Sequence, residues 1–171
     1  EPTVEIMVRA GFEWLALDLE HAPISIADAA RLIRIIDLAG VPALCRLPSN
    51  DPVIAKRVLE AGAAGIIVPS IESAEEAQRA VEAAYYPPRG RRGVGLSRAQ
   101  GYGQSFETYR AGLEECMVVV AMIETAAGVQ AADAIAETPG IDAVIIGPYD
   151  LSASLGYVGQ LEHPAVMNAC A

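Results

Sequence analysis

Short apolar stretches alternate with amphipathic stretches along the whole chain. The apolar stretches are hydrophobic at successive positions, which is typical of strands buried on both faces of a parallel sheet. Strands are predicted at residues 14–19, 42–46, 64–69, 117–123 and 143–146. The stretches between them carry apolar residues at helical spacing. These patterns predict helices at residues 25–39, 52–61, 73–84 and 126–137, and a further helix or turn from Leu151.

The repeated order of a strand followed by a helix predicts an α/β fold. Periodicity leaves two architectures open, a doubly wound open sheet and a (β/α)8 barrel. A complete barrel usually needs about 250 residues and rarely fewer than about 200, whereas this chain has 171. The chain also begins on what reads as the end of a helix, at residues 4–10, and stops inside another. If the fold is a barrel, we expect one domain at residues 1–171 that lacks the first and last β/α units.

Charge narrows the range of partners. The chain has 22 acidic and 12 basic residues, so its net charge is −10. Such a protein repels nucleic acids and anionic membrane surfaces, and we expect neither as a partner. An anionic substrate would need positive charge supplied locally, by an arginine or a metal ion.

The three cysteines, Cys45, Cys116 and Cys170, are far apart in the sequence and form no CxxC motif. They are typical of thiols in a reducing compartment rather than of a disulfide framework or a zinc site. No apolar run approaches the roughly 20 residues that span a bilayer, and no signal peptide opens the sequence. We therefore expect a soluble cytoplasmic domain.

Polar residues that can do chemistry follow the predicted strands. They are Asp18, Glu20 and His21 after the first strand, Arg46 at the end of the second, Glu124 after the fourth and Asp150 after the fifth. In a parallel α/β fold the carboxyl ends of all strands lie at one edge, which is where such folds hold their active sites. We therefore expect these residues to converge.

Two of these carboxylates suggest a metal site. Glu124 and Asp150 can offer oxygen ligands to one cation, and oxygen ligation suits Mg²⁺ or Mn²⁺ better than zinc. Each carboxylate can instead cap the helix that follows it. For the pair at matched strand ends, the metal is the favoured interpretation.

Two basic side chains have alternative roles. His21 stands among carboxylates and suits a general base near neutral pH, although a lone histidine is more often structural. The planar group of Arg46 suits a carboxylate or an enolate oxygen, and a salt bridge to a neighbouring carboxylate fits the sequence equally well. The segment at residues 147–152 leads into a helix whose backbone N–H groups can hold a substrate carboxylate.

Several motifs occur in a fixed order: LDLEHAP at residues 17–23, CRLPSNDP at 45–52, YPPRGRRGVG at 86–95, MIET at 122–125 and IGPYDLSASLGY at 146–157. Together they resemble the HpcH/HpaI aldolase/citrate-lyase family over essentially the whole chain. The resemblance implies a (β/α)8 TIM barrel of the phosphoenolpyruvate/pyruvate type. It also implies a class II aldolase, a carbon–carbon lyase that cleaves or forms 4-hydroxy-2-oxo acids through a pyruvate enolate. The implied cofactor is a divalent metal ion, Mg²⁺ or Mn²⁺ with Co²⁺ as a third candidate, and the implied partners are a 2-oxo acid, an aldehyde and further copies of the chain.

The resemblance assigns roles residue by residue. His21 corresponds to the catalytic base, Arg46 to the arginine that binds substrate and stabilises the enolate, Glu124 and Asp150 to the metal ligands, and Glu60 to an acidic residue that pairs with the base. The backbone of Tyr149 and Asp150 is expected to face the substrate carboxylate. Met122 departs from the pattern, because several members have glutamine there.

Two other readings remain. One is a CoA-ester lyase of the malyl-CoA or citryl-CoA type, which would need a basic nucleotide-binding surface. Arg89, Arg91 and Arg92 are the candidate cluster for it. The other is a non-catalytic fragment of the same fold that retains the motifs.

Overall fold

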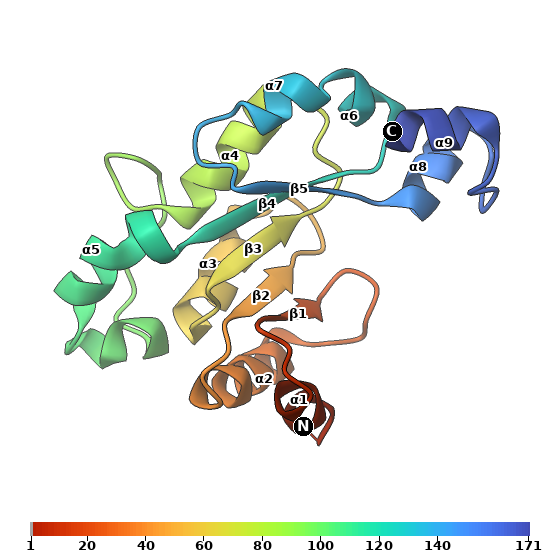
Figure 1. Ribbon diagram of the computed structural model, residues 1–171. Helices are drawn as coiled ribbons and strands as arrows, with labels where there is room; N and C mark the ends of the chain where they lie inside the picture. Colours follow the sequence, from red (N-terminus) through yellow and green to blue (C-terminus); the bar gives the residue numbers. More distant parts are fainter. Residues whose placement is uncertain (1) are drawn as a thin grey trace.

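The structure, a computed structural model that describes residues 2–171, contains a five-stranded sheet. Its strands are β1 (Leu15–Asp18), β2 (Ala43–Arg46), β3 (Gly65–Val68), β4 (Val118–Ile123) and β5 (Ala143–Ile146). They lie side by side in chain order, and every neighbouring pair is parallel (Figure 1). A doubly wound sheet reverses its strand order at a switch point, whereas a barrel keeps the order of the chain. The α/β prediction is confirmed, and the strand order is that of a (β/α) barrel.

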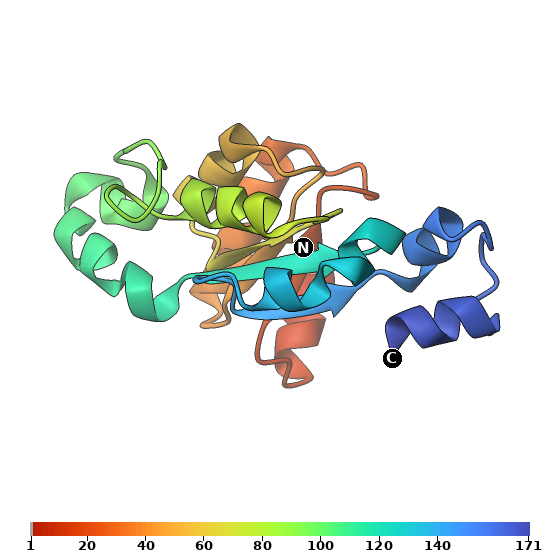
Figure 2. The same cartoon turned by 90° about the horizontal axis from the view of Figure 1, so that it is seen from above.

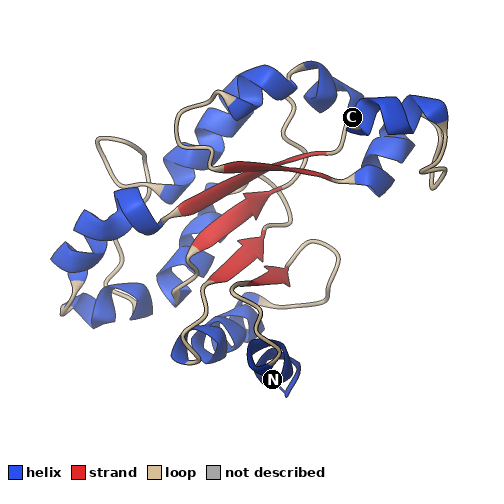
Figure 3. Cartoon of the chain, viewed as in Figure 1, coloured by secondary structure: helices blue, strands red, loops and turns tan. Residues whose placement is uncertain are grey.

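Helices connect and flank these strands (Figure 3). They are α1 (Pro2–Arg9), α2 (Ile26–Leu38), α3 (Pro52–Ala61), α4 (Ala74–Ala84), the 3₁₀ helix η1 (Arg98–Gly103), α5 (Phe106–Cys116), α6 (Ala126–Gln130), α7 (Ala132–Ala136), α8 (Pro148–Ser154) and α9 (Pro164–Cys170). Seen from above, α5 lies at one end of the molecule and α8 and α9 at the other (Figure 2). The two ends of the strands therefore meet different sets of helices.

The sequence pattern predicts most of these elements. The predicted strands and the helices α2, α3 and α4 agree with the structure to within a few residues. The single helix predicted at residues 126–137 is divided into α6 and α7 at Ala131. Helix α5 falls outside the prediction, because Leu113 is its only buried residue among those described and its apolar pattern is correspondingly weak.

The core lies between the sheet and its helices. Alternate residues of a strand point to opposite faces. One set packs with the helices in the large core and includes Leu15, Leu17, Cys45, Ile66, Val68, Val119 and Ala121. The other set forms a smaller cluster of Leu44, Ile67, Val120 and Met122. Residues of β5 are less covered, with Val144 37% and Ile146 41% exposed.

Side-chain caps begin the helices that follow the strands. Ser25 caps α2, Asp51 caps α3, Ser73 caps α4 and Thr125 caps α6, each accepting a backbone N–H of the first turn. One such cap contributes about 1 kcal/mol and satisfies a donor that the helix leaves free. The caps thus fix where each strand-end loop stops and where its helix starts. Within residues 2–171, no helix combines the length and the apolar composition needed to cross a membrane.

Candidate active site

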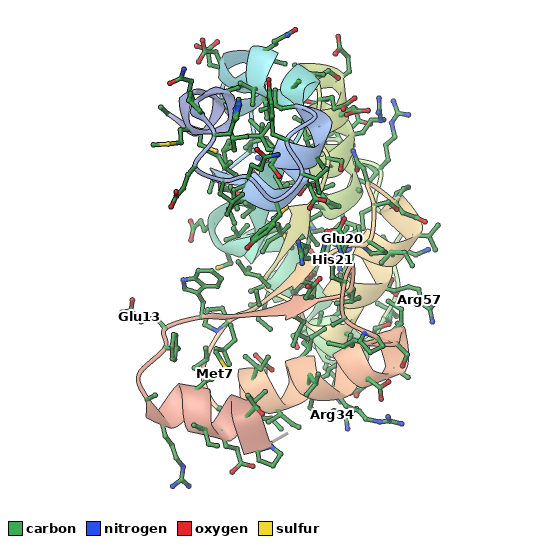
Figure 4. All side chains as sticks on the ribbon, turned by 90° about the vertical axis from the view of Figure 1, so that its right-hand side faces the viewer. Met7, Glu13, Glu20, His21, Arg34 and Arg57 are labelled. Atoms are coloured by element: carbon green, nitrogen blue, oxygen red, sulfur yellow. The ribbon has the colours of Figure 1, made fainter. Side chains whose placement is uncertain are left out.

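The carboxyl ends of the strands carry the polar residues that the sequence singles out. Asp18 and Arg46 are the last residues of β1 and β2 and occupy paired positions of the two strands. Glu124 follows β4, and Asp150 lies in the first turn of α8, after β5. Figure 4 shows Glu20 and His21 next to each other in the loop after β1. The strand ends therefore bring together residues that are distant in the sequence.

Arg46 is held by two carboxylates. Its Nε donates to Asp18 Oδ1 at 3.0 Å, and its Nη2 donates to Asp18 Oδ2. The third nitrogen, Nη1, lies 3.2 Å from Glu20 Oε2 and 4.0 Å from the sulfur of Met122. This hydrogen bonding raises the pKa of Arg46 and lowers the pKa of Asp18 from 3.8 to about 2. The salt-bridge interpretation of Arg46 is therefore correct, and Nη1, which pairs with Glu20, is the nitrogen that a substrate can share.

His21 joins the β1 loop to α8. Its Nε2 lies 3.7 Å from Glu20 Oε2 and 4.0 Å from Asp150 Oδ2, and its side chain is 57% exposed. The backbone N–H of His21 donates to Asp18 Oδ1 at 3.2 Å, which fixes the start of the loop. An imidazole placed in this way is accessible to a ligand and has carboxylates on both sides.

Glu124 is buried, at 2% exposure, and has one oxygen committed and one free. Oε1 accepts the backbone N–H of Ser70 at 2.8 Å and its hydroxyl at 2.9 Å. Oε2 is buried and has no hydrogen-bond partner among the described residues. Ser70 holds this geometry with a φ of +52°, a conformation that is uncommon outside glycine and that costs about 1 kcal/mol or more. A Cβ on Gly147 would stand 2.5 Å from the free oxygen, so glycine leaves room for it.

Negative charge accumulates at this edge. The pKa of Glu20 is raised, first by its burial and then by the charge of Glu124, with a smaller contribution from Asp150. Glu20 Oε2 has a cation beside it, Arg46 Nη1 at 3.2 Å, whereas Glu124 Oε2 is buried and has neither a hydrogen-bond donor nor an ion pair among the described residues. Buried carboxylate oxygens in this state are unfavourable unless a cation or a proton lies next to them. The arrangement therefore fits a bound cation.

The protein part of a metal site would be small. Within residues 2–171 there is no group of three or more His, Cys, Asp or Glu side chains placed to hold a metal ion together. Mg²⁺ and Mn²⁺ are commonly bound by one or two carboxylates, with water and substrate completing the shell. The donors present here, Glu124 and Asp150, agree with that mode of binding.

Glu60 does not join this cluster. It lies in the last turn of α3, directly before the chain enters the amino end of β3, and its carboxylate lies against Gly95. His21 follows the opposite, carboxyl end of β1. Within residues 2–171 Glu60 therefore lies away from His21, because a helix that follows a parallel strand returns to the other edge of the sheet, and the pairing of the two residues stays a prediction.

The first turn of α8 lies as expected beside the cluster. Tyr149 is 67% exposed, and its carbonyl accepts the Ser152 hydroxyl at 2.6 Å. Its own N–H and that of Asp150 are first-turn donors, which an α-helix leaves without an internal acceptor. The backbone here can meet a substrate carboxylate.

The three arginines of the candidate nucleotide-binding cluster do not form one surface. Arg89 pairs with Glu114 of α5, and Arg91 pairs with Glu82 of α4. Arg92 is buried at 3% exposure. Arg91 and Arg92 line one pocket, whereas Arg89 stands apart from it, so the three arginines do not make the single basic surface that a CoA-ester lyase would need.

Two residues of the site have partners that the sequence does not predict. Asp18 stands at a strand end like the others, and its partnership with Arg46 could have been inferred from their equivalent positions in adjacent strands. Ser70 gave no signal, because its contact with Glu124 depends on a backbone conformation that serine rarely adopts.

Comparison with known proteins defines the family. The model of the HpcH/HpaI aldolase/citrate lyase family matches residues 2–171, and the chain belongs to this family. The chain is 38% identical over 165 residues to the 2-dehydro-3,6-dideoxy-6-sulfogluconate aldolase of Pseudomonas putida. It is also 38% identical over 164 residues to the 5-keto-4-deoxy-D-glucarate aldolase of Salmonella paratyphi A. Both alignments include 96% of this chain and 64% of the relative, so the chain spans less than two thirds of the length of these relatives.

Solved structures agree with this assignment. An HpcH/HpaI aldolase/citrate lyase family protein from Burkholderia cenocepacia J2315 superimposes with a TM-score of 0.92 at 37% identity, over 99% of this chain and 68% of that one. The HpcH/HpaI aldolase from Desulfitobacterium hafniense DCB-2 gives a TM-score of 0.87 at 34% identity, over 98% and 65%. The fold is therefore that of the HpcH/HpaI aldolases.

Proposed function

We propose that the chain carries the catalytic edge of a metal-dependent class II aldolase, a carbon–carbon lyase that cleaves or forms 4-hydroxy-2-oxo acids through a pyruvate enolate. One observation carries the proposal. Glu124 is buried with one oxygen held by Ser70 and the other without a donor, at the edge where Arg46 and His21 lie. The names of the two relatives compared above describe aldolases of acidic keto sugars. This supports the same class of reaction for the present chain.

In this proposal Glu124 and Asp150 hold the divalent ion, Mg²⁺ or Mn²⁺ with Co²⁺ as a third candidate. When bound, the ion supplies Lewis-acid stabilisation of the 2-oxo acid. The backbone N–H groups of Tyr149 and Asp150 bind the substrate carboxylate at the start of α8. These contacts orient the 2-oxo acid across the strand ends.

Arg46 stabilises charge on the enolate oxygen through Nη1. Asp18 occupies Nε and Nη2 and thereby fixes the direction of Nη1. A donor fixed before the reaction stabilises developing charge without reorganising. His21 moves the proton of the aldol hydroxyl, which suits an exposed imidazole because histidine exchanges protons near neutral pH.

We also propose a cytoplasmic homo-oligomer that acts on small molecules, a 2-oxo acid and an aldehyde, rather than on nucleic acids or membranes. The net charge of −10 disfavours polyanionic partners. Exposed apolar side chains of the C-terminal part, Val158 at 75% and Met167 at 57%, support contact with a further copy.

The proposal is tested by screening 4-hydroxy-2-oxo acids for pyruvate release, coupled to lactate dehydrogenase. Metal is first removed with a chelator and then returned as Mg²⁺, Mn²⁺ or Co²⁺. Pyruvate release should stop in chelator and resume with metal. Malyl-CoA serves in parallel as the substrate of the rival lyase. Cleavage of malyl-CoA alone, or pyruvate release that survives excess chelator, would exclude the proposal.

A further inference from the structure

A pocket with several basic side chains in its lining lies away from the strand ends, between α3 and α4. Its volume is about 360 Å³. Lys56 lines it from α3, Arg79 and Glu82 from α4, and Arg91, Arg92 and Gly93 from the segment that follows α4. None of the residues assigned above to the aldolase reaction lines this pocket. Its function must therefore be inferred separately from that of the catalytic edge.

The pocket concentrates positive charge on an acidic protein. Four of the chain's twelve Lys and Arg residues line it, against a single carboxylate, Glu82. The formal charge of the lining is therefore +3, although the whole chain carries −10.

Ion pairs compensate only part of this charge. Arg91 Nε lies 3.0 Å from Glu82 Oε2, and Arg79 Nη2 lies 3.1 Å from Glu76 Oε1. Within residues 2–171, Lys56 makes no ion pair. Two of the four cations thus retain their partners, and the lysine remains available to a ligand.

Arg92 is the more unusual cation, because it is 3% exposed and no described carboxylate pairs with it. Its Nη1 donates to the Tyr109 hydroxyl at 2.9 Å and to the Ala84 carbonyl at 3.4 Å, and its guanidinium lies 4.9 Å from the centre of the Tyr86 ring. Its Nε and Nη2 are buried with no hydrogen-bond partner among the described residues. A buried cation in this state is unfavourable unless a negative charge lies near it.

We propose that this pocket binds a phosphate group, as inorganic phosphate or as a phosphate monoester. Phosphate carries between one and two negative charges near neutral pH, which suits the two cations, Lys56 and Arg92, that the ion pairs leave uncompensated. Lysine binds phosphate as a point charge, and arginine binds it through its planar array of N–H groups. Lys56 makes the direct contact, Arg91 shares its guanidinium between Glu82 and the phosphate, and the buried charge of Arg92 adds to the local positive potential.

The test titrates inorganic phosphate into the metal-free protein by calorimetry at low ionic strength, where charge interactions are least screened. Lys56→Gln and Arg91→Gln each remove one cation from the pocket. Arg57→Gln is the matched control, because Arg57 is the next residue of α3, is exposed and does not line the pocket (Figure 4). Each pocket variant should weaken binding about ten-fold or more, the usual effect of losing a hydrogen bond to a charged group. The control should stay within about twofold.

Two outcomes of the titration would contradict the phosphate site. Equal phosphate affinity in the wild type, the two pocket variants and the control would overturn the site. So would phosphate binding that is lost in Arg46→Lys but kept in Lys56→Gln, because the anion would then occupy the catalytic edge. Competition with adenosine monophosphate separates the two sources, since displacement shows a monoester site and its absence shows a site for the free ion. The phosphate titration and the competition experiment both measure binding to the metal-free protein, so their outcomes do not depend on the aldolase proposal.

Discussion

Asp18 and Arg46 stand opposite each other at the ends of two parallel strands and form a fork of two hydrogen bonds. This contact decides which nitrogen of Arg46 faces the rest of the site. Because Asp18 occupies Nε and Nη2, only Nη1 remains directed towards Glu20 and Met122. The sequence predicts the arginine, and the neighbouring strand determines its orientation.

Replacing Arg46 separates a catalytic role from a structural one. Arg46→Lys keeps the charge but loses the planar group that contacts Asp18 and a substrate at the same time. We expect kcat for pyruvate formation to fall about 10²–10³-fold, as on loss of one preorganised donor. The melting temperature should change little, because partly exposed ion pairs contribute little to stability. A lower melting temperature with kcat within about threefold of wild type, a change under 1 kcal/mol, would make Arg46 structural.

The same pair predicts a pH dependence of stability. The pKa of Asp18 is lowered from 3.8 to about 2, mainly by the hydrogen bond from Arg46. A carboxyl whose pKa falls on folding stabilises the fold above its ordinary pKa, and the effect is lost as the pH falls towards the lowered value. The free energy of unfolding should therefore decrease as the pH is lowered from about 4 to about 2.

Urea unfolding at a series of pH values measures this effect. Asp18→Asn should flatten the curve in that window. Asp133→Asn, which changes an exposed carboxylate of α7 that makes no ion pair among the described residues, should leave it unchanged. Parallel curves for wild type and Asp18→Asn would refute the link.

Ser70 offers a test of how Glu124 is oriented. Ser70→Ala removes the hydroxyl that donates to Oε1 at 2.9 Å but keeps the backbone N–H. Groups that orient a metal ligand typically affect metal affinity about 10–100-fold, so we expect the Mn²⁺ dissociation constant to rise by about ten-fold. Ser70→Gly also loses the hydroxyl but relieves the positive φ, so it should lose the same affinity without losing stability. Unchanged Mn²⁺ binding in both variants would remove Ser70 from the site.

At the scale of elements, the connection from β5 to α8 shapes the space beside Glu124. Gly147 has a φ of −97°, which alanine also adopts, so a methyl group there acts through space alone. That methyl group would stand 2.5 Å from Glu124 Oε2. The absence of a side chain at Gly147 thus leaves the space next to the buried carboxylate free.

Gly147→Ala should therefore displace the carboxylate and weaken Mn²⁺ binding by at least about ten-fold, with the fold retained. Gly112→Ala in α5 is the matched control, because a Cβ there meets nothing within 4 Å. It should keep Mn²⁺ affinity and raise stability by about 0.5–1 kcal/mol, as glycine is unfavourable within a helix. If Gly147→Ala binds Mn²⁺ as tightly as Gly112→Ala does, the free oxygen of Glu124 is not a ligand.

The elements also show what the sequence can predict. Strands and helices with strong apolar patterns, such as β3 and α4, were predicted because burial dictates their periodicity. Helix α5 was missed because it buries too little apolar surface to show a pattern. For Glu60 the motif gives no information on which edge of the sheet the residue reaches, whereas the return of α3 to the amino end of β3 fixes it.

At the scale of the whole molecule, charge is distributed unevenly between two regions. Carboxylates gather at the carboxyl ends of the strands, where a cation is proposed, and basic residues gather between α3 and α4. Convergence at the strand ends could be predicted, because parallel strands share their direction. The basic pocket could not, because Lys56, Arg79 and Arg92 come from separate segments whose packing against one another leaves no mark in the sequence.

The central claim is that Glu124 and a divalent metal ion together stabilise a pyruvate enolate. Exchange of the pyruvate methyl protons with D₂O, followed by NMR, measures enolate formation without any aldehyde. Exchange should require Mn²⁺ or Mg²⁺, stop in chelator, and fall by at least about 10²-fold in Glu124→Gln, which keeps the size of the side chain but removes its charge. Exchange that continues at the wild-type rate in excess chelator, or in Glu124→Gln, would contradict the account.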